Sequence, residues 1–349
     1  MMKKGKGKIC SLFWLILVLI STGPVFGQEV LAQKNNDFYD NEPFKALPIS
    51  SLEIAGEVEA AGWYKLVDLP LHQVIVREAR KIGDKSIFIG AYVYQGYSLF
   101  DVLKNQILNK KNKEEFSSPI DLLVIIQNKK GEKAIFSWGE IFYPSVLHRL
   151  IIATRVAPII PSLTGESWPL PEACKIVAAN DPISERNLEE PIKITVQSCP
   201  INYPVIKSKK PLFSDKVKII YRDKEITSIN SLPKDINTIT LPSVFFGRGR
   251  GFHGLREFKG IPLRQLIGKY LPIDILNQKD TYLLFVADDG YRAVFSAAEI
   301  FNRNDGAEVL LCQLGQAEGG RFSLYPSFDF FSDRAVKALK EIHILKIDN

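Results

Sequence analysis

The hydrophobic residues of this chain recur in short strand-like runs separated by tight turns. Residues 121–142 (DLLVIIQNKKGEKAIFSWGEIF) and 282–301 (YLLFVADDGYRAVFSAAEIF) each predict a hydrophobic strand, a turn, a second strand and the start of a helix or turn. In the second block, Asp288-Asp289-Gly290 lies between the two strands. Because Asp-Gly is a preferred hairpin dipeptide, we interpret these carboxylates as turn residues and not as a metal or catalytic pair.

The two blocks belong to an internal repeat. The segment from Gly90 to Leu99 aligns without a gap on the segment from Gly254 to Leu263, and each runs into a short amphipathic helix, FDVLKNQI or RQLIGKYL. Further matched pairs are Gly131 with Gly290, Phe136-Ser137 with Phe295-Ser296, Glu140 with Glu299, and Ser184-Glu185-Arg186 with Ser332-Asp333-Arg334. A repeated order of features indicates that one structural unit occurs twice.

We therefore predict an α/β mixed (α+β) fold made of a tandem duplicated unit. Copy 1 is expected over residues 48–200 and copy 2 over 212–349, joined by a linker at 201–211 that is rich in proline and lysine. A polar, flexible leader is expected over residues 28–47.

The N-terminus has the pattern of a secretory signal peptide, assigned to residues 1–27. Four lysines precede the apolar run LFWLILVLI, and Gly23-Pro24 breaks that run ahead of cleavage candidates at Gly27 and Ala32. A periplasmic or secreted location follows, and an uncleaved signal would be the expected route to a membrane. Cleavage after Gly27 removes four lysines and no acids, which takes the formal net charge from +6 to +2. This near-neutral balance argues against a nucleic-acid partner.

The cysteines do not form a recognisable framework. Cys174, Cys199 and Cys312 remain after export, and their spacing fits neither a disulfide scaffold nor a C-x-x-C metal site. A disulfide between Cys174 and Cys199 stays open in an oxidising compartment, and Cys312 is expected to be a buried small hydrophobe.

The repeat resembles the molybdopterin-binding domain of the sulfite oxidase superfamily. The residues that carry the likeness are Phe258-Lys259-Gly260-Ile261-Pro262-Leu263 with the leucines that follow, the strand-turn-strand block at 282–301, and the Arg334 segment before the last strand. The resemblance implies a molybdopterin cofactor whose phosphate is held by arginines, and a cysteine thiolate on the metal about a dozen residues before the G-[IV]-P-L motif. Counting back 12 residues reaches Arg248 in copy 2 and Asp84 in copy 1. Neither side chain replaces a soft thiolate.

The segment GRGRGFHG (247–254) contains the candidate binding residues. Gly249, Gly251 and Gly254 match G-x-G-x-x-G, but Gly260 and Pro262 come too early for the helix that a dinucleotide fingerprint requires. An anion site fits better, because glycines let backbone N–H groups converge while Arg248 and Arg250 offer bidentate donors and His253 a further one. A solvated loop is the alternative.

The sequence predicts no metal site. His72, His148 and His343 are scattered singly and are expected to be structural or surface residues. The aromatic groups Tyr92, Tyr94, Tyr97 and Phe328, Phe330, Phe331 have the spacing of packed strands.

The sequence is compatible with three functions. The first is an exported binding protein that lacks the metal-ligating cysteine and holds a small anionic ligand or a pterin-type cofactor through Arg248, Gly249, Arg250, Gly251 and His253. The second is an active molybdopterin-dependent oxidoreductase of the envelope with a redox partner. The third is a structural or adaptor module of an envelope complex.

Overall fold

The computed structural model describes residues 42–347, except positions 50, 84, 162, 202, 207–211, 277–278 and 316–319. The signal peptide at 1–27 and most of the leader at 28–47 lie outside the described residues, and the described residues belong to one compact unit, Tyr39–Asn349. Within them, none of the helices has the length and apolar character needed to span a bilayer.

The expected α/β mixed (α+β) fold is wrong. The chain is mostly β, with 48% strand and 10% helix, and its four small sheets are arranged like the blades of a four-bladed β-propeller. The amphipathic patterns that predicted helices of about eight residues give only α1 (Leu99–Leu103) and α3 (Leu263–Gly268). The segments before these two helices form long hairpin strands, so each unit contains far more strand than helix.

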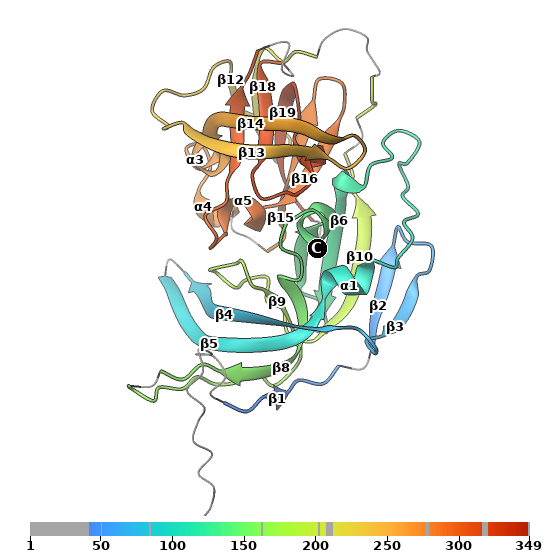
Figure 1. Cartoon of the computed structure of the whole chain (residues 1–349), viewed down its shortest axis with the longest axis vertical. Coiled ribbons are helices and arrows are strands. Elements are labelled where there is room, and N and C mark those ends of the chain that lie inside the picture. The colour runs from blue at the N-terminus through green and yellow to red at the C-terminus, as the bar shows by residue number, and fades with distance from the viewer. Residues whose placement is uncertain are drawn as a thin grey trace, which may run out of the picture. The chain divides into compact units, whose positions relative to one another are not determined.

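The first half contains two sheets of five strands each (Figure 1). One sheet has the order β1-β8-β5-β4, with β9 paired to β8, and the other has the order β3-β2-β10-β6-β7. The strands are β1 (Lys45–Ala46), β2 (Ser51–Gly56), β3 (Gly62–Lys65), β4 (Leu71–Ile82), β5 (Lys85–Ser98), β6 (Leu122–Asn128), β7 (Lys133–Ser137), β8 (Leu150–Pro158), β9 (Lys175–Ala178) and β10 (Pro191–Ser198). Strand β1 falls inside the segment expected to be a leader.

The second half contains a sheet of five strands, β12-β11-β19-β15-β16, and a sheet of four, β13-β14-β17-β18. The strands are β11 (Val217–Tyr221), β12 (Lys224–Ile229), β13 (Ile239–Gly247), β14 (Gly251–Pro262), β15 (Thr281–Ala287), β16 (Arg292–Ser296), β17 (Val309–Gln313), β18 (Phe322–Pro326) and β19 (Leu339–Lys346). The short helices are η1 (Pro119–Asp121), α2 (Trp138–Phe142), α4 (Ile273–Leu276), α5 (Ala298–Phe301) and η3 (Ser332–Arg334).

The two halves share one strand topology. In the five-stranded sheet β3-β2-β10-β6-β7, β10 runs parallel to β2 and antiparallel to β6, and in the second half β19 runs parallel to β11 and antiparallel to β15. These parallel pairs distinguish the sheets from the simple meanders of other propeller blades. Asp288-Asp289-Gly290 forms the predicted hairpin turn between β15 and β16, with Gly290 at φ 81°.

Close backbone approach explains why a glycine recurs in the repeated motif. A Cβ atom on Gly96 would lie 2.0 Å from the Ile152 carbonyl oxygen of β8, and a Cβ atom on Gly260 would lie 2.5 Å from the Leu311 carbonyl oxygen of β17. Both distances are far inside van der Waals contact. The glycines therefore allow β5 and β14 to pair with β8 and β17 just before α1 and α3 begin.

The halves share hydrophobic core across their boundary. The core cluster that fills the second half also contains Phe116, Ile120 and Tyr143 from the first half. In a second cluster, strands β6 and β7 pack against β15 and β16 through residues such as Leu123 and Leu284. The duplicated units thus form one continuous body over the described residues.

Candidate metal centre

The five predicted binding residues lie together at the tip of the β13–β14 hairpin. Arg248, Gly249 and Arg250 form an exposed turn, and Gly251 follows at φ 73°. His253 is also exposed, with its ring centroid 5.6 Å from that of Phe245. Strand β14 continues to Pro262, so the turn leads into a strand and not into a helix that would face a phosphate.

A different group of titratable residues converges in the first half. His72 Nε2 lies 2.6 Å from Asp101 Oδ2. His148 Nδ1 lies 3.5 Å from the same oxygen and shares a hydrogen bond of 2.9 Å with Ser98 Oγ. The two imidazole rings stack with their centroids 3.8 Å apart and 6° between their planes. All three candidate ligand atoms lie within 4.8 Å of one another. We call these three residues the His-Asp-His cluster.

Local structure explains the position of each member. His72 is the second residue of β4, and Asp101 lies in the first turn of α1. Ser98 caps that helix by accepting a hydrogen bond from the Asp101 backbone N–H at 3.0 Å. His148 precedes β8 in the left-handed region at φ 67°, a conformation that is costly for a residue with a side chain and is concentrated at functional sites.

Hydrogen bonds fix the charge state of the central carboxylate. Burial acts to raise the pKa of Asp101, but hydrogen bonds from Lys104, Ser98 and His72 outweigh it and lower the pKa to about 2. The Lys104 Nζ to Asp101 Oδ1 distance is 2.7 Å, and Ser98 Oγ donates to Asp101 Oδ2 at 2.8 Å. Burial and the neighbouring His72 lower the pKa of His148, which favours the neutral imidazole that a metal ion requires.

The cluster exists in one copy only. Strand registers and the repeat alignment give an equivalent position in copy 2 for each polar member. The residues at positions equivalent to His72, Ser98, Asp101 and His148 are Ile239, Pro262, Gln265 and Ala307. Since the second copy builds the same backbone without these groups, the fold itself does not require them.

The donor set suits a divalent transition-metal ion. Two imidazole nitrogens and one carboxylate oxygen supply three protein ligands, and such sites leave one or more coordination positions open. Ligand atoms around zinc are spaced by about 3.3 Å for bonds near 2.0 Å. The 2.6 Å hydrogen bond between His72 and Asp101 would therefore have to lengthen as the metal replaces the proton. Lys104 and Ser98 already orient the carboxylate from outside the ligand set.

Sequence reasoning missed this cluster because its members are 29 and 47 residues apart along the chain. His72 and His148, which the sequence predicts to be structural or surface residues, lie next to one carboxylate. His343 lies apart from them, with Nε2 2.7 Å from Tyr203 Oη and 2.8 Å from Glu341 Oε2. One signal was present in the repeat. Ser98 and Asp101 stand on either side of the matched Leu99 and Leu263, at positions where copy 2 has Pro262 and Gln265.

The lowered pKa of Asp101 predicts a loss of stability in acid. An acid whose pKa falls from 3.8 to about 2 on folding stabilises the folded state above pH 4, and this contribution disappears as pH falls from 4 to 2. We expect the difference in unfolding free energy between the wild type and Asp101→Asn to shrink by about 2 kcal/mol over that window. Urea denaturation at a series of pH values measures it. A difference that stays constant from pH 6 to pH 2 would contradict the assignment.

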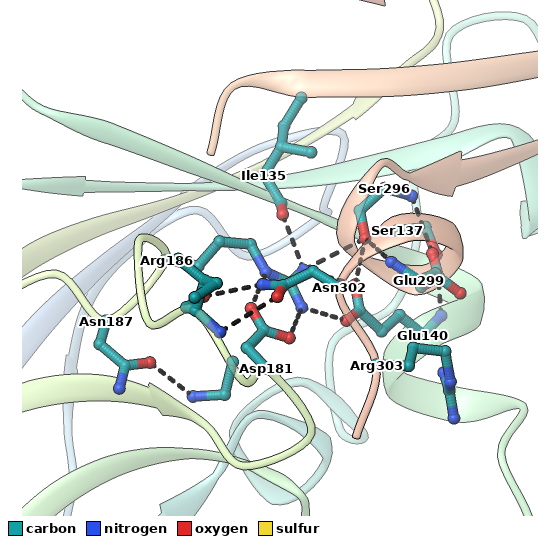
Figure 2. A network of polar contacts seen from close by, with 12 residues as sticks. Ile135, Ser137, Glu140, Asp181, Arg186, Asn187, Ser296, Glu299, Asn302 and Arg303 are labelled. Atoms are coloured by element: carbon teal, nitrogen blue, oxygen red, sulfur yellow. Dashed lines mark hydrogen bonds and ion pairs between the residues drawn. The ribbon is translucent and has the colours of Figure 1, made fainter. Parts of the chain in front are cut away.

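A second polar network joins the two halves (Figure 2). Arg186 forms bidentate ion pairs with Asp181, at 2.8 Å for each bond, and with Glu140, at 2.6 and 2.9 Å. Its guanidinium also donates to Ser296 Oγ of the other half at 3.1 Å and lies 4.4 Å from the ring centroid of Phe136. Each of the three nitrogens of this buried guanidinium therefore donates a hydrogen bond.

Arg334 repeats this arrangement with the halves exchanged. It pairs with Asp329 at 2.7 and 2.6 Å and with Glu299 at 2.6 Å, and it donates to Ser137 Oγ of the first half at 3.1 Å. The guanidinium lies 4.1 Å from the Phe295 ring centroid. The residue pairs that match in the sequence repeat therefore make equivalent contacts in the structure, as if related by a local two-fold axis. Complete mutual satisfaction of these charges indicates a structural role.

The cysteines do not supply a metal ligand. Cys174, Cys199 and Cys312 are free and buried, so the open question of a Cys174–Cys199 disulfide is answered by separate thiols. Burial raises the pKa of the first two to about 11 and that of Cys312 to about 12. These thiols are protonated at neutral pH and closed off by the core.

Neither a scan against protein-family models nor a search of curated proteins finds a match to this chain.

Proposed function

We propose that this protein is an exported metal-binding protein that holds a divalent transition-metal ion, with zinc as the reference ion, through His72, Asp101 and His148. The observation that carries the proposal is the convergence of their three ligand atoms within 4.8 Å, in one copy of a duplicated fold. Export is supported by the signal-peptide pattern of residues 1–27.

The residues around the cluster support an open coordination position. His72 and His148 are half-buried, whereas Asp101 is only 3% exposed, so the carboxylate is held inside while the imidazoles face outward. A cavity of about 30 Å³ beside His148 is lined by Phe100, Leu147 and Asn180, among others, and has room for one water molecule. A bound ion could thus keep a water ligand or accept a small donor.

The molybdopterin cofactor expected from the sequence resemblance fits these residues poorly. The described cysteines are buried protonated thiols in core clusters, and the arginines at 248 and 250 lie on an exposed turn. Without an accessible thiolate or a cradle, we assign this cofactor no step in the function. An envelope redox or adaptor partner stays a prediction from the sequence.

A metal titration tests the proposal. The purified mature chain is stripped with a chelator and titrated with Zn²⁺ at pH 7.5 by calorimetry, and Co²⁺ is used as a spectroscopic substitute. We expect one ion per chain and the visible absorption band of Co²⁺ in a low-coordinate nitrogen and oxygen site. Binding should weaken below pH 6, because protons compete for the imidazoles. Absence of saturable binding by either ion overturns the proposal.

A further inference from the structure

We propose that the β13–β14 hairpin is a docking arm for an anionic lipid bilayer. This inference does not depend on the metal site, which lies on different elements of the first half. It develops the anion site expected at Arg248 and Arg250 by naming the surface that these side chains would meet.

The arm presents apolar side chains to solvent. Val244, Phe252 and Leu255 are 60%, 62% and 77% exposed, and their nearness on one hairpin makes them an apolar patch and not scattered single residues. Val244 and Leu255 are direct cross-strand partners, so they share one face, and Phe252 lies opposite Phe246 nearer the tip. A shallow groove on this face is lined by Val244, Leu255 and their neighbours.

Basic residues surround these apolar side chains. Between Ile239 and Pro262 the chain carries Arg248, Arg250, Arg256 and Lys259 against the single acid Glu257, a net charge of +3 from four bases minus one acid. Among the residues described, the side chains of Arg248 and Arg250 have neither an ion pair nor a hydrogen-bond partner. The tip touches the rest of the protein through a hydrogen bond from the Arg248 backbone N–H to Asp333 Oδ2 at 3.0 Å and through Phe246, whose ring centroid lies 5.7 Å from that of Phe330 and 6.2 Å from that of Phe331.

This combination favours a bilayer over other occupants. Exposed aliphatic and aromatic groups next to unpaired cations match the apolar and anionic layers of a lipid interface. An acidic polymer in solution would use the cations but would leave Phe252 and Leu255 in water. A second copy of the chain would have to place the net charge of +3 against itself if it used the same face.

The equivalent arm of the first half is built differently. The β4–β5 hairpin also has an exposed apolar residue near its tip, Ile82, at 62%. There, however, Lys81 pairs with Asp274, and Phe88 packs edge-on against Trp168 with centroids 5.4 Å apart. Both arms therefore contact the rest of the protein, but on the β4–β5 arm a cation next to the exposed Ile82 is paired, whereas the side chains of Arg248 and Arg250 are not paired with any described residue. This difference makes the β4–β5 arm a matched comparison for the β13–β14 arm.

Vesicle binding tests this inference. The mature chain is sedimented with vesicles of phosphatidylcholine alone and of phosphatidylcholine with phosphatidylglycerol. We expect binding to the anionic vesicles that weakens as salt rises. Arg248→Gln with Arg250→Gln should lower the partition coefficient about 30-fold, and Phe252→Ser with Leu255→Ser on the order of 100-fold.

The matched controls are Ile82→Ser, at equal exposure, and Arg80→Gln with Lys85→Gln on the β4–β5 arm, all expected to bind vesicles like the wild type.

Three results would overturn the inference: equal binding to neutral vesicles, equal loss in the controls, or binding to a soluble polyanion with none to vesicles. A concentration-dependent dimer abolished by Leu255→Ser would also overturn it, in favour of self-association. Zinc titration of the same variants should be unchanged, so failure of the metal proposal and of this one can be told apart.

Discussion

Arg334→Met is expected to lower the free energy of unfolding by about 3–5 kcal/mol. The guanidinium is fully buried and pairs with Asp329 and Glu299 while donating to Ser137 of the other half. Removing it leaves two carboxylates in the core without a counter-ion. The cost is dominated by these stranded charges, because the attraction within a buried ion pair is largely offset by desolvation when both partners are present. Urea denaturation at pH 7 measures the change.

Companion variants separate this explanation from a simple loss of packing. Arg186→Met should cost a similar amount, since its partners repeat those of Arg334, and adding Asp329→Asn and Glu299→Gln to Arg334→Met should recover part of the loss. Arg264→Met serves as the surface control. Arg264 pairs with Glu308 at 2.7 Å but is 52% exposed, so its loss should cost less than about 1 kcal/mol. A change below 1 kcal/mol for Arg334→Met would show that the network is dispensable.

Asp101→Asn and His148→Ala are each expected to lower the affinity for Zn²⁺ about 100-fold or more. Loss of a residue outside the ligand set costs 10–100-fold in known sites, so loss of a ligand lies at or beyond the upper end of that range. Asp101 supplies the one negative charge of the cluster, and Asn keeps its shape while removing that charge. Calorimetric titration of each variant at pH 7.5 gives the affinity.

The control for the metal variants is His253→Ala, which removes an exposed imidazole from the β13–β14 arm and should leave Zn²⁺ affinity unchanged. Unfolding curves distinguish lost ligands from lost structure, since Asp101→Asn should remain folded at pH 7. If the cluster only caps α1 and binds no metal, Asp101→Asn and His253→Ala will have the same weak affinity for Zn²⁺. Equal affinity in the wild type and in Asp101→Asn would therefore exclude Asp101 as a ligand.

The hydrophobic pattern of the sequence did not predict the fold class correctly. The segments FDVLKNQI and RQLIGKYL have helical spacing, but α1 ends at Leu103 and α3 at Gly268. Strands β4, β5 and β14 have 12, 14 and 12 residues. The β4–β5 and β13–β14 hairpins extend past the next strand of their sheets, because β5 pairs with β8 only from Tyr92 onward and β14 pairs with β17 only from Gly260 onward. Such arms carry polar and exposed apolar side chains that give weak strand signals, because a period of two is clear only where one face is buried.

Of the two candidate sites, the sequence predicted one and missed the other. The residues 248–253 were singled out from local glycine and arginine chemistry, which a short segment reveals by itself, and the structure places them on one exposed hairpin. The His-Asp-His cluster was not found, since its members come from a strand, a helix and a loop that only the paired strands β4, β5 and β8 bring together.

The repeat and the hairpin turn at Gly290 could be read from the chain alone, as could the matched pairs Ser137 and Ser296, Glu140 and Glu299, and Arg186 and Arg334. These features are local or are repeated in order, so they can be read along one chain. Three other features required the folded chain: the two arginine networks that interlock across the halves, the separate buried thiols, and the two distant histidines beside one carboxylate. Those outcomes depend on which surfaces are buried together, and burial is set by the packing of all strands at once.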